Sequence, residues 1–266
     1  MTRILLIALA LSLTACASYF KKKECESTNW FEHGKKVALR GEWLNSDKLV
    51  NECRKVEAEI QESQLDQGFK SGMQKYCSPP YAYQVGKSGD FYSREVCEGP
   101  QINVLLAEHK KGVKDYCAKS NGQNAGTSGK KYQNICPKDL EPAFLVEYRK
   151  GRKRYVQAMI SSRESDVRDI ETKIYSRRAD LSYNQGRLGS LEREVSSLEA
   201  QRNFTPIANS SQRSYLDGRI SSLSTDVSSL RSTVSGIQID INNLERERQT
   251  KMDEIKEFKA ELPSLD

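Results

Sequence analysis

The sequence predicts an all-α protein in two parts, a disulfide-stapled head of helical repeats and a long antiparallel coiled-coil hairpin. Three observations lead to this prediction. Glycine and tyrosine recur at helical spacings with a period near forty residues, six cysteines stand in the N-terminal half after the first segment, and two heptad seams follow, separated by a proline. The hydrophobic fraction of 37% is low for a chain of 266 residues. We therefore expect thin helical layers in place of one large core.

The first sixteen residues predict an export signal that ends in a lipidation site. Arg3 precedes an apolar run from Ile4 to Leu13, and Leu13-Thr14-Ala15-Cys16 has the form of a lipobox. The apolar run is too short for a transmembrane helix. We expect residues 1–15 to be a signal peptide and Cys16 to be acylated, which would anchor the protein stably through two or more acyl chains. The alternative is an ordinary secretory signal followed by an unmodified cysteine.

The residue after Cys16 indicates a destination. Ala17 stands where, in the usual Gram-negative sorting rule, an aspartate would retain a lipoprotein at the inner membrane. We therefore expect an outer-membrane lipoprotein that faces the periplasm. Residues 16–24 are expected to form a tether, and the eight residues between Cys16 and Cys25 reach at most about 29 Å, which keeps the head close to the bilayer.

Six cysteines remain once Cys16 is assigned to lipid, and they define a head expected over residues 25–140. They are Cys25, Cys53, Cys77, Cys97, Cys117 and Cys136. An even set in an oxidising compartment predicts disulfides, although six cysteines permit fifteen pairings. The repeat described next favours Cys77 with Cys97 and Cys117 with Cys136, which would leave Cys25 with Cys53.

An internal repeat with an offset of forty residues runs through the head. Its first copy contains Gly72, Tyr76, Cys77, Gly86, Gly89, Tyr92 and Cys97, and its second copy contains Gly112, Tyr116, Cys117, Gly126, Gly129, Tyr132 and, after one deletion, Cys136. Glycines and tyrosines three or four residues apart share one face of a helix. Glycine inside a helix costs about 1 kcal/mol relative to alanine, so its recurrence predicts another backbone packed closely against that face.

These spacings predict short helices and two loops in the head. The helices are expected near 30–40, 46–62, 65–77, 83–96, 103–117 and 124–135. The loops are expected at Ser78-Pro79-Pro80 and Ser120-Asn121-Gly122, where proline or glycine favours a turn. Disulfides would then stabilise helices that enclose little apolar volume.

The same residues, between about 25 and 155, carry a resemblance to a known family. The pattern consists of Cys25, Trp30, Gly34, Gly68, Gly72, Tyr76, Cys77, Gly86, Gly89, Tyr92 and Cys97, with second-copy partners through Tyr148 and Gly151. It resembles a group of bacterial lipoproteins catalogued as domain of unknown function 2799. The first block of that family is Trp-x3-Gly-x2-Asp-Gly-x2-Gly, and here Val37-Ala38 replaces Asp-Gly before Gly41. The resemblance implies an envelope lipoprotein and no established activity.

A coiled-coil hairpin is predicted over residues 141–262. Asp139 can cap the first helix, and Pro142 is tolerated in the first turn. Apolar residues then follow each other at spacings of three and four along two arms. The first arm contains Val167, Ile170, Ile174, Leu181, Leu188, Leu191, Val195 and Leu198. The second contains Leu216, Ile220, Leu223, Val227, Leu230, Val234, Ile237, Ile241, Leu244, Ile255, Phe258 and Leu262.

The two arms share one antiparallel register if the chain reverses at a tip over residues 203–211. The residue numbers of opposing apolar pairs then sum to a nearly constant value, from Leu198 with Leu216 to Ile160 with Ile255. The hairpin would be about 65 Å long at 1.5 Å per residue. A dimer that exchanges arms satisfies the same rule. Three polar residues interrupt the seams and are interpreted as register-fixing positions, namely Arg177, Asn184 and Arg248.

The excess of basic over acidic residues belongs to the head. Residues 16–155 carry 25 Lys+Arg against 18 Asp+Glu, whereas residues 156–266 carry 16 against 18. One basic cluster, Lys21 to Lys23, lies just after the lipidation site, and a second consists of Arg149, Lys150, Arg152, Lys153 and Arg154. Either cluster can meet anionic lipid or acidic cell-wall polymer, or can simply be solvated surface. A nucleic-acid partner is not expected for an exported chain without a recognised nucleic-acid module.

Two apolar residues at the tip, Phe204 and Ile207, form a candidate partner contact. The alternative is that they close the last layer of the coiled coil. Elsewhere the sequence shows no catalytic pattern: His33 and His109 lack zinc-ligand spacing, and there is no Cys-x-x-Cys, P-loop, dinucleotide fingerprint or nucleophile elbow. We therefore predict no enzyme activity, metal or cofactor.

The sequence thus predicts a non-enzymatic envelope lipoprotein. In the leading hypothesis its hairpin acts as a structural scaffold that contacts or spaces an envelope protein. In the alternative the basic head is a binding module that holds cell-wall polymer or anionic lipid, and the hairpin is only a spacer.

Overall fold

The computed structural model describes residues 18–97 and 99–266, and the predicted Cys16 lipidation site lies outside them. Helices and connecting loops make up these residues, with no β-strand in the described ranges, which confirms the all-α prediction. The chain divides into two compact units, one that ends at Arg152 and one that comprises Lys153–Asp266. The first unit is called the head and the second the hairpin. None of the described helices is both long and apolar enough to cross a bilayer.

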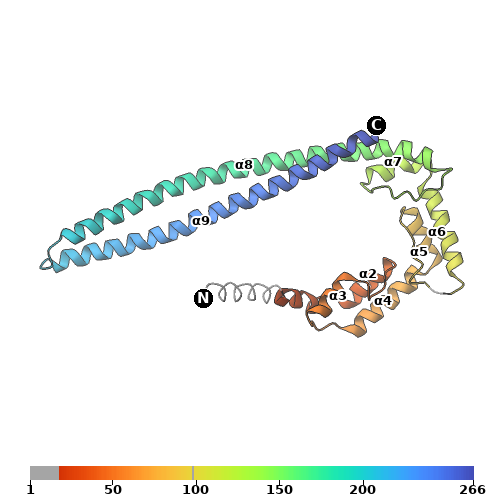
Figure 1. Ribbon diagram of the computed structural model, residues 1–266, viewed down its shortest axis with the longest axis horizontal. Coiled ribbons are helices and arrows are strands. Elements are labelled where there is room, and N and C mark those ends of the chain that lie inside the picture. Colours follow the sequence, from red (N-terminus) through yellow and green to blue (C-terminus); the bar gives the residue numbers. More distant parts are fainter. Residues whose placement is uncertain (1–17, 98) are drawn as a thin grey trace, which may run out of the picture. The chain divides into compact units, whose positions relative to one another are not determined.

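The head begins with a helix over residues 18–26, followed by α2 (Trp30–Leu39), α3 (Lys48–Lys55) and α4 (Glu62–Tyr76). It continues through α5 (Pro79–Lys87), α6 (Ile102–Tyr116) and α7 (Lys119–Thr127) into α8 (Glu141–Phe204), as Figure 1 shows. Because the head extends to Arg152, it also includes the first turns of α8, beyond the boundary expected at residue 140.

Three helix pairs, α2 with α4, α5 with α6, and α7 with the start of α8, repeat one packing arrangement. A β-carbon at Gly68 would collide with the carbonyl oxygen of Phe31, and one at Gly112 with that of Tyr83. In the third pair, a β-carbon at Gly151 would collide with the carbonyl oxygen of Gln123. The predicted close backbone approach at the repeat glycines is confirmed.

Two helices of the repeat are displaced from their predicted positions. The helices expected at 83–96 and 124–135 instead occupy Pro79–Lys87 and Lys119–Thr127. Both end where Gly89 and Gly129 adopt positive φ values of 71° and 83°, the left-handed conformation that terminates a helix. The expected loop at Ser78-Pro79-Pro80 starts α5, because proline needs no N–H partner in a first helical turn.

The helix at 46–62 is also shorter than predicted, since α3 is limited to Lys48–Lys55. Glu57 follows it with a φ of 52°, so the chain turns before α4. The expected loop at Ser120-Asn121-Gly122 lies within α7, where a β-carbon at Gly122 would stand 2.5 Å from the Phe144 carbonyl oxygen. Gly122 is therefore a packing residue and not a turn residue.

Tyrosines of the repeat fix the loops that link the two helices of the second and third pairs. Tyr76 and Tyr92 stack with ring centroids 4.7 Å apart, and the Tyr92 hydroxyl donates to the Tyr76 carbonyl oxygen at 2.8 Å. The Ser93 N–H donates to the Tyr76 hydroxyl oxygen at 2.8 Å. In the third pair the Tyr132 N–H donates to the Tyr148 hydroxyl oxygen at 2.9 Å. Tyr92 and Tyr132 therefore belong to loops and not to a helical face with the glycines.

The hairpin consists of the remainder of α8 and of α9 (Ser210–Glu261), which ends in a 3₁₀ helix, η1 (Leu262–Leu265). The two long helices run antiparallel, side by side, from a turn between Phe204 and Ser210 (Figure 1). Every predicted seam residue is buried or partly buried. The predicted helical hairpin is confirmed.

Ion pairs between the arms follow the same register. They have N–O distances of 2.5 to 3.1 Å and are Arg163–Glu254, Lys259–Glu164, Arg178–Glu245, Arg231–Glu192, Arg219–Glu194 and Arg202–Asp217. Each exposed pair contributes at most about 1 kcal/mol. Asn184, expected to help fix the register, donates instead to the Asp180 carbonyl oxygen of its own helix at 2.7 Å.

We predict opposite effects of glycine-to-alanine substitutions in the two units. Gly112→Ala should destabilise the head by at least about 2 kcal/mol, because the new methyl group meets the α5 backbone. Gly186→Ala, where no atom lies within 4 Å, should stabilise the hairpin by up to about 1 kcal/mol. Thermal unfolding together with hydrogen exchange, which assigns each change to its unit, measures both effects. A Gly112→Ala variant as stable as the parent chain would contradict the backbone contact.

Candidate functional site

The six cysteines of the head form the three disulfides that the repeat favoured. Cys25 pairs with Cys53, Cys77 with Cys97, and Cys117 with Cys136, with Cα–Cα distances of 5.6 to 5.7 Å. Two of these bonds join the end of one helix pair to the loop of the next. The third fixes the N-terminal helix to α3. These cysteines are therefore structural, and none of them is free to act as a nucleophile.

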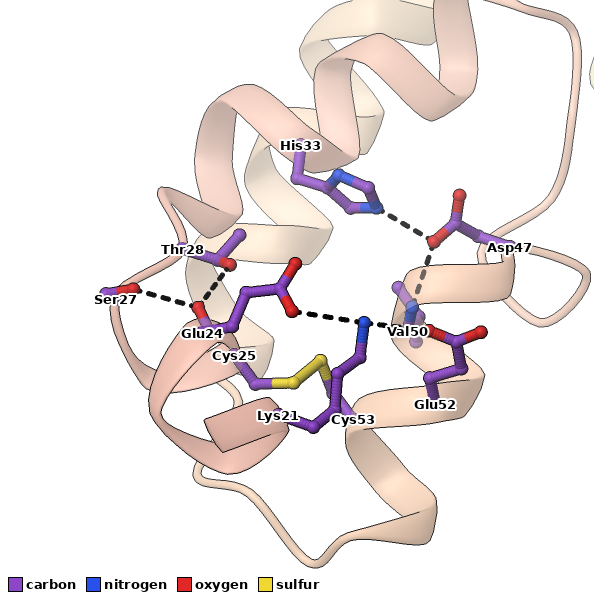
Figure 2. The surroundings of a disulfide bond; sticks show 10 residues. All are labelled: Lys21, Glu24, Cys25, Ser27, Thr28, His33, Asp47, Val50, Glu52 and Cys53. Atoms are coloured by element: carbon purple, nitrogen blue, oxygen red, sulfur yellow. Dashed lines mark hydrogen bonds and ion pairs between the residues drawn. A yellow bond between two sulfur atoms is a disulfide. The ribbon is translucent and has the colours of Figure 1, made fainter. Parts of the chain in front are cut away.

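The N-terminal helix is fixed to the head on one face, as Figure 2 shows. Besides the Cys25–Cys53 bond, Lys21 Nζ lies 2.8 Å from Glu52 Oε2 and 3.3 Å from Glu24 Oε2. The hydrogen bond to Glu52 raises the pKa of Lys21. The segment expected to be a tether, residues 16–24, is helical from residue 18 onward.

A buried carboxylate joins α2 to α3 (Figure 2). Asp47, only 5% exposed, caps α3 and accepts a hydrogen bond from the Val50 N–H at 2.9 Å. It also accepts from His33 Nε2 and from Arg40 Nη2, both at 2.8 Å. Burial by itself would raise the pKa of Asp47, but the hydrogen bonds from Val50, His33 and Arg40 outweigh it, and the pKa is lowered.

Both histidines therefore have structural partners. His109 Nε2 hydrogen-bonds the Asp90 carbonyl oxygen at 2.8 Å, and His33 binds Asp47 as described. Within the described ranges, no three His, Cys, Asp or Glu side chains come together in a way that would hold a metal ion.

The second basic cluster is divided between interior and surface. Arg152 is only 2% exposed, and its Nη1 donates to the Gly129 carbonyl oxygen at 2.5 Å. Lys150 pairs with Glu147 at 2.9 Å, and Lys153 pairs with Asp266. Arg149 and Arg154 are exposed. Arg152 thus contributes to the packing of α7 on α8.

The repeat contained a signal for the burial of Arg152. It follows the repeat glycine Gly151, as the apolar residues Met73 and Val113 follow Gly72 and Gly112. Val113 is buried and Met73 packs against the apolar core. A basic residue at this repeat position is therefore expected to face the neighbouring helix, with its charge satisfied by a backbone carbonyl.

The tip of the hairpin is an ordered loop with exposed apolar side chains. Arg213 Nη1 donates to the Thr205 carbonyl oxygen at 2.8 Å, and the Thr205 hydroxyl donates to the Gln201 carbonyl oxygen at 2.8 Å. Phe204 and Ile207 are 88% and 85% exposed. Their side chains therefore do not close the last layer of the coiled coil.

Comparison with protein families gives a match in the head. Residues 29–112 and 100–153 match the model of a family described as "Protein of unknown function (DUF2799)". Residues 29–153 belong to this family. The resemblance noted from the repeat is thus confirmed, and the two overlapping matches agree with a DUF2799 head built from repeated helix pairs. No curated protein and no solved structure matches the chain.

The recurrent residues of the DUF2799 head have packing roles in this structure. The glycines permit the backbone contacts, the tyrosines fix the loops, and the cysteines connect successive helix pairs. The hairpin tip and the N-terminal helix each carry exposed apolar side chains that have no such packing role.

The lowered pKa of Asp47 predicts a pH dependence of stability. A carboxyl with a lowered pKa stabilises the fold above its unfolded pKa, about 3.9, and loses this contribution as the pH falls through the folded pKa. We expect Asp47→Asn to destabilise the head by about 1–3 kcal/mol at pH 7 and to flatten the loss of stability below pH 4.

Asp66→Asn is the matched control, because Asp66 is an exposed residue paired only with Lys70. Denaturant unfolding at pH 7 and between pH 2 and 5 measures both variants. Equal stabilities of the Asp47→Asn and Asp66→Asn variants at pH 7 would contradict the role of the buried carboxylate.

Proposed function

We propose that the chain is a non-enzymatic lipoprotein of the cell envelope, anchored in the outer membrane and facing the periplasm, whose hairpin tip docks a partner protein. The observation that carries this proposal is the exposure of Phe204 and Ile207 on an ordered loop. Large apolar side chains that are held in place without being buried are typical anchors of protein interfaces.

The tip carries the two most exposed large apolar side chains among the described residues of the hairpin. The other strongly exposed aromatic residues of the hairpin, Tyr175, Tyr183 and Tyr215, carry a hydroxyl group that water can solvate. Phe204 and Ile207 have no polar side-chain atom. Because Arg213 and Thr205 already hold the loop, a partner would bind it with little loss of conformational entropy.

The length of the hairpin supports a role at a distance. The 52 residues of α9 extend over about 78 Å at 1.5 Å per residue. Its seam and the ion pairs between the arms resist separation of the helices. A rod of this kind keeps its tip at a set distance from the position where the hairpin starts, which suits a scaffold or spacer.

The tip is tested by photo-crosslinking in cells from a residue introduced at position 209, next to the apolar pair. We expect a discrete crosslinked protein that Phe204→Ala/Ile207→Ala abolishes and that Tyr175→Ala/Tyr183→Ala, the matched exposed pair on α8, leaves unchanged. The proposal fails if no discrete product forms, or if both double variants behave alike.

The role of length is tested by removing one heptad from each arm, residues 182–188 and 227–233. This deletion preserves the seam register and both ends of the hairpin and shortens it by about 10 Å. We expect the crosslink from the tip to be lost while far-UV circular dichroism and the three disulfides stay as in the parent chain. An undiminished crosslink would show that reach is not required.

A further inference from the structure

The helix over residues 18–26 leaves its outer face uncovered. Tyr19 and Phe20 are 65% and 70% exposed and contact each other edge to face, with ring centroids 5.9 Å apart. Lys22 and Lys23 are exposed and have no acidic partner among the described residues. The opposite face carries Cys25 and Lys21, which fix the helix to α3.

The residues of this helix are arranged in order along its axis. The aromatic pair comes first, the lysines follow, and Glu24 and Glu26 come last. At a membrane surface, aromatic rings occupy the interface, basic groups meet the anionic headgroups, and acidic groups stay in water. The helix presents these three kinds of residue in that sequence, with the aromatic end nearest to Cys16.

The helix over residues 18–26 is attached rigidly to the head, so a membrane contact made by the helix would also position the head. A flexible tether would let the head move away from the bilayer, whereas this helix is held by a disulfide and by the Lys21–Glu52 ion pair (Figure 2). If an acyl chain holds residue 16 at the membrane, the outer face of the helix lies within a few residues of the lipid. Any insertion of Phe20 is then transmitted directly to α3 and the head.

We propose that the N-terminal part of this outer face, formed by Tyr19, Phe20, Lys22 and Lys23, is a membrane seat that binds an anionic bilayer surface and orients the head on it. The occupant is the lipid surface itself, with the two rings at the interface and the two lysines at the headgroups. This inference rests on the acylation of Cys16 in the proposed function and adds a second contact that acylation alone does not supply.

The test uses residues 16–266 attached to vesicles through Cys16. The other six cysteines are in disulfides, so a maleimide-headgroup lipid reacts with the Cys16 thiol alone. The vesicles contain either phosphatidylethanolamine with 30% phosphatidylglycerol or phosphatidylcholine only, with brominated acyl chains as a quencher. Phe20→Trp reports on the seat, and Phe91→Trp, a comparably exposed ring of the head, is the matched control.

We expect blue-shifted, bromolipid-quenched emission from Phe20→Trp on the anionic vesicles and neither change from Phe91→Trp. Each lysine near an anionic surface contributes about fivefold in binding, so Lys22→Gln/Lys23→Gln should lower the ratio of seated to unseated helix roughly 25-fold. Lys131→Gln/Lys138→Gln removes the same charge from exposed positions elsewhere and should leave the quenching unchanged.

Unquenched emission from Phe20→Trp on the anionic vesicles would overturn the membrane seat, as would equal effects of the two lysine pairs. Because the vesicles contain no other protein, this result is independent of any partner at the hairpin tip. The mass of the mature N-terminal peptide from cells checks acylation separately, and an unmodified Cys16 would remove the anchor on which the seat depends.

Discussion

Close contact between helix backbones is the constraint on which the head depends. At Gly68, Gly112 and Gly151 a methyl group would meet a carbonyl oxygen of the paired helix. The two helices of each pair therefore approach each other more closely than any residue with a β-carbon would allow. Short helices with a low apolar content gain little from side-chain burial, and close backbone approach recovers part of this loss through dispersion contacts. Disulfides and tyrosine-bound loops then connect the pairs into one unit.

This packing also explains how the two units are joined. The third pair needs a long helix to match α4 and α6, and the first turns of α8 provide it, with Gly151 against α7. The same helix then continues into the hairpin, whose glycines meet no neighbouring backbone and whose stability comes from its apolar seam. Gly151 and Gly186 stand on one helix, yet only the first is required by a neighbouring backbone.

Buried charged groups and exposed apolar groups differ in whether they have partners within the protein. Asp47 and Arg152 are satisfied inside the head. Exposed apolar side chains lie on the helix nearest to Cys16 and at the turn between α8 and α9. Our two proposals, a membrane seat at the first site and a protein partner at the second, address these side chains separately, and each can be tested without the other.

The sequence by itself determined the helical class and the repeat and predicted the register of the hairpin, because spacing along a chain dictates which residues share a helical face. It favoured the disulfide pairs without fixing them, since six cysteines permit fifteen pairings. The boundaries predicted for α5 and α7 were wrong. Gly86 and Gly89 are three residues apart whether Gly89 continues a helix or ends it, so the spacing does not show where the helix stops. Only the tertiary structure decided this, through the Tyr116 ring that occupies the space of a β-carbon at Gly89. The tertiary structure also supplies the Gly129 carbonyl oxygen, in the turn after α7, that accepts a hydrogen bond from Arg152, because a buried charge is tolerated only where its polar atoms find partners.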